Sequence, residues 1–377
     1  MLPYHPTLRL KLGEYVAASR IAPDIQKYVR PRFVICPPKD RDPEKGEPLT
    51  PDEIAHFSGE RMGKYWPIRS AFVDPQFVAP TLGDSGLRTL FRIAQGRNPN
   101  LIPVATVNDL FNPVYSTFLR SASPSLGVYI PYSEVEPENL LEGLKATGAS
   151  PQDTVVFVDF TGTDLTPEIA AGSVAGILDH LNECAVWARI VFQGSAFPTK
   201  NPADAGAHKL VPRDEWKTFL AALRECSVQR DVIAYGDFGA DCGEMTFSTN
   251  GGGIPIRHLR YTTPDHTLVV RGSKDGQDKE VMKQVFQRIL DSGHFAGQHF
   301  SYADDRIWRG AKGLDGCGNA SMWREWNTAH HITRVVRDLG AMEGIQFSDG
   351  RVSKPSQQIN WLEDDDAVIE PIESQNT

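Results

Sequence analysis

The 377-residue sequence lacks the patterns that mark several large classes of protein. No apolar run approaches the roughly 18 residues that a membrane-spanning helix needs. The first residues lack the basic and apolar regions of a secretory signal. The five cysteines are widely spread and form no C-x-x-C pair, which favours reduced thiols. We therefore expect a cytoplasmic protein that does not enter a membrane.

Several catalytic and binding motifs are also missing. No G-x-G-x-x-G follows the first predicted strand, which argues against a dinucleotide site. No H-E-x-x-H, D-x-D-x-D-G or His-x-His is present, and Gly194–Ser195 is not part of a G-x-S-x-G elbow. The net charge of -9 gives no overall attraction for nucleic acid, although a local basic channel is compatible with it.

The sequence does contain a repeated pattern of short apolar runs, several of which end on a polar residue. The clearest run is Thr154–Asp159, which is rich in β-branched residues and is followed by a turn and a helix-like segment over 166–183. A continuous apolar run bounded by turns is typical of a strand buried on both faces, and the helix after it indicates a βα unit. The predicted strands are 7–11, 32–36, 68–73, 101–107, 127–131, 154–159, 186–192 and 231–235. Helices are predicted over 14–29, broken or restarted at Pro23, and over 84–95, 212–226 and 279–290, and a hairpin-like pair of strands is predicted at 257–261 and 267–271.

Eight strands, seven of them followed by a helix, match a (β/α)8 TIM-like barrel in number and length. A doubly wound open α/β sheet is the alternative. In this interpretation residues 1–340 form one barrel domain, with a C-terminal elaboration that includes an insertion over 250–318. The segment 293–301 within the insertion is either a lid over the barrel or, more commonly, a packed connector. Residues 341–377 are predicted to be an acidic tail.

Polar residues gather at the predicted C-terminal ends of the strands, which form the functional mouth of a barrel. They are Lys11, Glu14, Asp74, Asn108, Asp109, Asp159, Gln193 and Asp237. Convergent carboxylates raise one another's pKa unless a cation compensates, and oxygen ligands suit Mg²⁺, Mn²⁺ or Ca²⁺. We therefore predict Asp74, Asp159 and Asp237 as metal ligands, although the cofactor itself stays open. Asp and Asn also commonly follow strands as turn residues and helix caps.

The candidate catalytic residues are Lys11, Glu14, Asp159 and Asp237, and the candidate substrate-binding residues are Asn108, Gln193, Ser195 and Arg324. Ser195 is a candidate backbone or phosphate contact. Arg324 lies in a region rich in basic and aromatic residues, including Trp323 and Trp326, which could stack nucleobases. A hydrophobic seal between the last helix and the barrel is the more common use of such tryptophans.

The adjacent residues His330 and His331 lie in a helix predicted over 321–339. Neighbouring side chains on a helix point about 100° apart, so the pair is not expected to chelate a metal. We predict that one histidine faces the core and the other faces solvent or the mouth.

Several segments resemble the phage-associated Beta protein family in their sequence and order. They are Tyr4–Glu14, Arg30–Phe33, Val158–Asp159, Gln193–Pro198, Tyr235–Asp237, Trp323–Arg324 and His330–Thr333. The resemblance covers most of the chain up to about residue 339, and Cys36 departs from it where the family pattern has an acidic residue. The family occurs in phages, prophages and bacterial defence islands. The resemblance therefore implies a role in anti-phage defence or its regulation, through a protein partner.

The resemblance supplies no chemistry, so whether the protein is an enzyme stays open. The competing hypothesis is a metal-dependent hydrolase that uses Mg²⁺ or Mn²⁺ to act on a phosphoester or nucleotide at the mouth of the barrel. A barrel that only binds its ligand is a third possibility. Nucleotide or nucleic acid is a candidate ligand in either case, and a defence protein can also be an enzyme.

Overall fold

The computed structural model describes residues 3–38, 49–227, 231–245, 247, 256–275 and 278–347. Its main feature is a closed barrel of parallel strands in the order β1-β2-β3-β4-β5-β6-β7-β9. Their bounds are β1 (His5–Arg9), β2 (Arg32–Val34), β3 (Ala71–Asp74), β4 (Leu101–Thr106), β5 (Leu126–Pro131), β6 (Thr154–Asp159), β7 (Arg189–Gln193) and β9 (Ile233–Asp237). Pairing of β1 with β9 closes the ring. The predicted (β/α)8 barrel is confirmed, and the open sheet is wrong.

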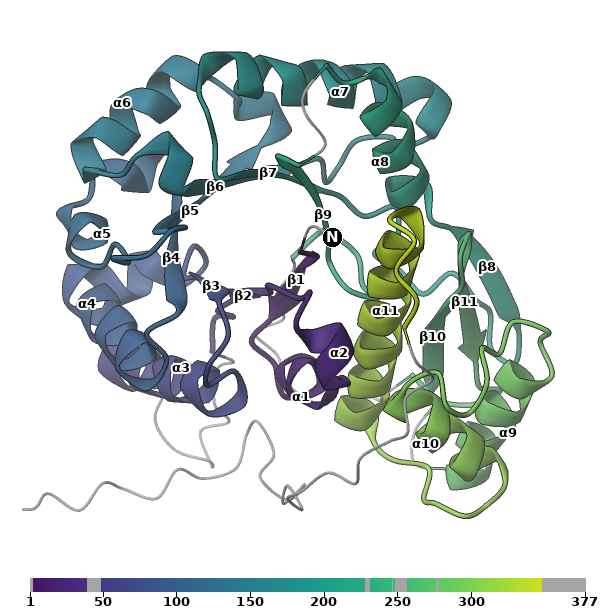
Figure 1. Ribbon diagram of the computed structural model, residues 1–377. Helices are drawn as coiled ribbons and strands as arrows, with labels where there is room; N and C mark the ends of the chain where they lie inside the picture. The colour runs from purple at the N-terminus through teal and green to yellow at the C-terminus, as the bar shows by residue number, and fades with distance from the viewer. Residues whose placement is uncertain are drawn as a thin grey trace, which may run out of the picture.

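Helices surround the barrel as an outer ring (Figure 1). They are α1 (Leu12–Arg20), α2 (Pro23–Gln26), α3 (Pro51–Tyr65), α4 (Ala79–Arg97), α5 (Pro113–Thr117), α6 (Pro137–Thr147), α7 (Pro167–Cys184) and α8 (Asp214–Glu225), with short 3-10 turns η2 (Asn108–Phe111), η3 (Tyr132–Glu134) and η4 (Pro151–Asp153). Pro23 restarts the helix as predicted. Thr50 and Glu53 form a capping box at α3, because each side chain accepts from the other's backbone N–H.

A small antiparallel sheet lies beside the barrel, in the order β10-β11-β8 (Figure 1). It contains β8 (His208–Pro212), β10 (His258–Thr262) and β11 (His266–Arg271). The hairpin of β10 and β11 is the predicted one. Strand β8 was not predicted, and its last residue, Pro212, was assigned to the following helix. Four of its five residues are exposed, so it lacks the alternation of a half-buried strand.

The C-terminal helices join this side sheet to the barrel. They are α9 (Lys279–Leu290), α10 (Tyr302–Ala311) and α11 (Ala320–Met342). Helix α11 packs against α1 on one side and against β10 on the other, between the barrel and the side sheet (Figure 1). The bounds of α11 confirm the helix predicted over 321–339. The segment 293–301 packs through Phe295 on Tyr261 of β10 and through Phe300 on His330 of α11.

Alternate residues of the strands face two different cores. The barrel interior holds a compact cluster of Phe72, Ile102, Val104, Val155, Phe157, Val191 and Ala234. Residues of the opposite parity, such as Ile190 and Tyr235, pack outward in the larger cluster that continues into α11 and the side sheet. The parity of a strand's last residue therefore decides whether its side chain enters the barrel or points outward.

Within the described part of the chain, no helix is both long enough and apolar enough to cross a membrane. The predicted acidic tail lies, from residue 348 onward, outside the described residues.

Candidate ligand site at the barrel mouth

An inner network of Arg32, Asp74, Tyr129 and Asp159 lies inside the C-terminal end of the barrel. The Arg32 side chain, from β2, is fully buried and lies 3.5 Å from Asp74 Oδ2. Its guanidinium carbon is 4.6 Å from the centre of the Tyr129 ring, which gives a cation–π contact. The Tyr129 hydroxyl donates to Asp159 Oδ2 at 2.8 Å. The arginine therefore links two of the predicted carboxylates across the mouth.

Both of these carboxylates also fix the turns that follow their strands. Asp74 accepts hydrogen bonds from the backbone and side chain of Gln76, each at 3.0 Å. Asp159 accepts from the Thr161 N–H at 2.8 Å. Burial raises the pKa of Asp74, and Arg32 opposes that rise. Asp74 and Asp159 therefore hold the turns after their strands, as such residues commonly do, and they also lie in the mouth of the barrel.

Asp237 points out of the barrel and away from the inner network, because it shares the outward parity of Tyr235. It accepts hydrogen bonds from Tyr4, from the Gly239 N–H at 2.9 Å and from His331 Nε2 at 2.9 Å. Burial opposes its ionisation, but these donors and the charge of His331 hold its pKa below the usual value. Asp237 therefore has a different environment from Asp74 and Asp159.

The three carboxylates predicted as metal ligands thus have separate protein partners. Among the residues that the structure describes, no three His, Cys, Asp or Glu side chains form a group that could hold a metal ion. On α11, His330 and His331 are both buried, so neither faces solvent, and His331 lines a small pocket beside the end of β9. Helix α11 is covered on two sides, so His330 contacts Asp304 while His331 contacts Asp237 and Thr262.

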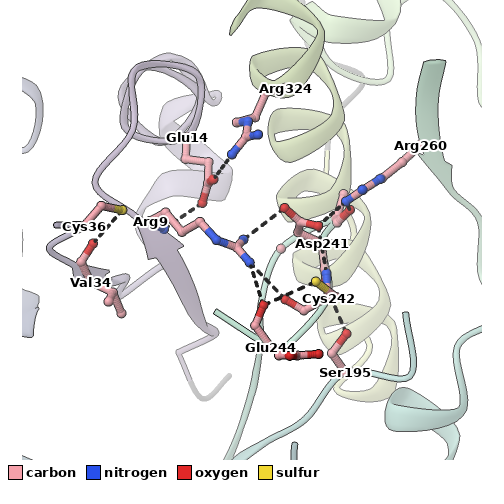
Figure 2. Close-up of polar contacts among 12 residues, drawn as sticks. Arg9, Glu14, Val34, Cys36, Ser195, Asp241, Cys242, Glu244, Arg260 and Arg324 are labelled. Carbon is pink, nitrogen blue, oxygen red and sulfur yellow. Dashed lines mark hydrogen bonds and ion pairs between the residues drawn. The ribbon is translucent and has the colours of Figure 1, made fainter. Parts of the chain in front are cut away.

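A second network, called the outer network, consists of Arg9, Glu14, Asp241, Arg260 and Arg324 (Figure 2). Asp241 Oδ2 is 3.0 Å from Arg9 Nη1, and its other oxygen contacts Arg260. Glu14 Oε1 is 3.1 Å from Arg324 Nη1, and its Oε2 accepts from the Arg9 N–H at 2.7 Å. The network draws together β1, α1, the segment after β9, β10 and α11.

Gly13 explains how Glu14 reaches Arg324. A Cβ atom at position 13 would lie 2.5 Å from the Ser321 carbonyl oxygen and 2.9 Å from Arg324 Cβ. Only a glycine allows α1 to approach α11 this closely. The sequence thus places the Glu14 carboxylate directly against the last helix.

Positive charge exceeds negative charge within the set formed by the outer network and the adjacent Lys11. Lys11 lies next to it, and burial together with Arg324 lowers the pKa of its ammonium group. Although burial opposes its ionisation, Arg260 and Arg9 hold the pKa of Asp241 well below its usual value. Four cationic side chains therefore stand against two carboxylates, whereas the whole protein has a net charge of -9.

A small pocket lies beside the outer network, between the ends of β7 and β9 and the side sheet. Its polar lining includes Ser195, Glu215, Asp237, Asp241 and His331. Ser195 Oγ donates to the Asp241 carbonyl oxygen at 3.0 Å, and Glu215 accepts from the Ala196 N–H at 3.2 Å. Burial raises the pKa of Glu215 to about 7, with Arg213 opposing the rise and Asp237 adding to it.

The remaining predicted site residues have different positions. Gln193 lies inside the barrel and donates to Thr7 of β1. Asn108 is exposed at the start of η2 and belongs to neither network. Trp323 and Trp326 are buried, and Trp326 packs on Phe286 of α9, a helix that contacts the side sheet.

Sequence reasoning missed Arg9, Arg32, Tyr129, Asp241, Arg260 and Glu215. The inward parity of Arg9 and Arg32 could have been read from the alternation along β1 and β2. Asp241 and Arg260 come from the region after the last barrel strand, where no local pattern points toward the mouth.

A family model described as Beta protein matches residues 4–337 of the chain. Among curated proteins and among solved structures, no significant match was found.

Proposed function

Because the chain belongs to the Beta protein family, we propose that it acts in anti-phage defence or its regulation, in the cytoplasm and together with a protein partner. This role follows from the resemblance of its segments to those of phage-associated and prophage-associated members. The chemistry that we propose for it is the binding of an anionic ligand at the mouth of the barrel.

The observation that carries the ligand proposal is the excess of cations within the outer network and the adjacent Lys11. The Arg9 side chain is only 5% exposed, and burying a guanidinium costs solvation free energy. Arg324 is 41% exposed, so it can reach a ligand that enters from solvent. Arginine forks match the geometry of phosphate and carboxylate groups, and a cluster of them attracts such groups from solution.

Nothing among the described residues favours the predicted metal-dependent hydrolase, so we do not advance it as a second function. A titration of the full chain with Mg²⁺ or Mn²⁺, followed by thermal unfolding, tests it separately, because a cation that binds only the folded state raises the midpoint.

We expect the full chain to bind pyrophosphate in calorimetric titrations at low ionic strength and in EDTA, and to bind it more weakly as salt screens the charges. Arg324→Gln should weaken this binding about tenfold or more, because hydrogen bonds to charged groups contribute about 1.5–3 kcal/mol.

Arg306→Gln is the matched control for this experiment. It removes the same charge from a side chain on α10 that is 43% exposed and pairs with Asp315. We expect it to leave the affinity for pyrophosphate unchanged. A parent protein that does not bind pyrophosphate, or equal losses in the two variants, would contradict the proposal.

A further inference from the structure

Aromatic rings lie on the rim of the mouth in direct contact with its cations. Phe77 follows β3 and is 37% exposed. Its ring forms a T-shaped pair with the ring of Phe247, with centres 5.0 Å apart. Lys11 Nζ in turn lies 5.7 Å from the centre of the Phe247 ring. The aromatic pair and the cationic cluster therefore form one continuous surface.

The rings of this surface differ in what covers them. The Phe197 ring is covered by Arg260, whose guanidinium carbon lies 4.4 Å from the ring centre. Phe77 contacts Phe247 and keeps 37% of its surface exposed to solvent. A ligand that covers the exposed part of this ring removes apolar surface from water, which is favourable.

We infer that the anionic ligand of the mouth is a nucleotide, whose base stacks on the Phe77–Phe247 pair and whose phosphate faces Lys11 and Arg324. The inference rests on the proposed function and names the class of ligand. Every nucleobase has a planar face that can stack on an aromatic side chain. Lys11 links the two parts of the site, since it contacts Phe247 and is the N-cap residue of α1, whose Glu14 pairs with Arg324.

Simpler anions and acidic peptides fit this surface less completely. Inorganic phosphate or a sugar phosphate would engage the cations and leave the rings uncovered. An acidic peptide would supply carboxylates but no planar group next to them. A nucleotide carries both features on one small molecule, with the base and the phosphate separated by the sugar.

The test compares AMP with ribose 5-phosphate, which has the same sugar and phosphate but no base. Calorimetric titrations of the full chain at low salt and in EDTA should show AMP binding more tightly, by about fivefold to a hundredfold, the range that base–aromatic stacking supplies. Phe77→Leu should remove this preference and leave the affinity for ribose 5-phosphate unchanged.

Phe111→Leu is the control variant. Phe111 is 53% exposed and lies after β4, outside the chain of contacts that links Phe77, Phe247 and Lys11. It should keep the preference for AMP. Thermal unfolding of both variants checks that each is folded.

The possible outcomes separate the two proposals. Equal affinities for AMP and ribose 5-phosphate, both reduced by Arg324→Gln, would overturn the nucleotide inference and support anion binding. Failure of both compounds and of pyrophosphate to bind would overturn both proposals. A Phe77→Leu protein that also loses its affinity for ribose 5-phosphate would overturn the assignment of this ring to the base.

Discussion

Asp241 holds the outer network together, because it is the carboxylate that contacts both Arg9 and Arg260. We expect Asp241→Asn to lower the free energy of unfolding by about 3 kcal/mol, measured by urea denaturation at pH 7. Removal of the shared carboxylate leaves two largely buried cations without their counter-charge, and uncompensated buried charges are strongly destabilising.

Asp315 provides a matched control, since it also contacts two arginines. Its partners Arg306 and Arg309 have side chains that are 43% and 39% exposed. Solvent screens such a pair, so Asp315→Asn should cost about 1 kcal/mol or less. Similar losses of unfolding free energy in Asp241→Asn and Asp315→Asn would show that burial does not increase the contribution of the outer network to stability.

The sequence located site residues through one rule, that polar residues at strand ends gather at the mouth. The rule placed Lys11, Glu14 and Asp159 at the mouth, where the structure has them. It failed for Asp237, because the end of a strand does not specify which face a side chain occupies. The inward position beside it belongs to Gly236, which has no side chain.

Helix α8 places Glu215 in the pocket beside the mouth, and this carboxyl should give the fold a measurable pH dependence. Burial raises its pKa from 4.5 to about 7, so the folded state favours the protonated form. The stability that it contributes is present below pH 4.5 and is lost as pH rises through 7.

Glu215→Gln removes this titration and keeps an oxygen that can accept from the Ala196 N–H. Relative to the variant, the parent protein should therefore lose on the order of 2 kcal/mol of unfolding free energy between pH 5 and pH 8. Urea unfolding of both proteins at the two pH values measures this difference.

Glu225→Gln, at the exposed end of the same helix, is the control. The difference in unfolding free energy between Glu225→Gln and the parent protein should be nearly the same at pH 5 and pH 8. A Glu215→Gln protein that behaves in the same way would contradict the proposed effect of burial.

Regular elements were predictable where one periodic pattern determines them. Most barrel strands are continuous apolar runs, although β1 (His5–Arg9) is mixed, and α9 was predicted with its observed bounds of Lys279–Leu290. The helix predicted to start at Asp84 begins at Ala79, but Gly83 interrupts it with φ of 58°, so regular helix resumes near the predicted residue. Strand β8 was missed because it pairs with β11, which lies far away in the sequence.

Across the whole molecule, one core connects the barrel to the side sheet. The larger hydrophobic cluster contains Val156 of β6, Tyr261 of β10 and Val335 of α11. Helix α11 contacts both α1 and β10, so it cannot leave one part without exposing the other. Because packed interfaces of this kind couple the unfolding of their parts, we expect residues 1–340 to unfold as a single cooperative unit.

Two core variants test this expectation. Val156→Ala in the barrel and Val335→Ala in the last helix each remove two methyl groups from a fully buried site and should each cost about 2 kcal/mol. If the molecule is one unit, each variant shifts the same single urea transition, whether it is followed by far-UV circular dichroism or by tryptophan fluorescence. Val186→Ala, at a residue that is 77% exposed, should leave the midpoint unchanged. Two separate transitions, or a Val335→Ala shift in only one of the two signals, would mean that the side sheet and α11 unfold independently of the barrel.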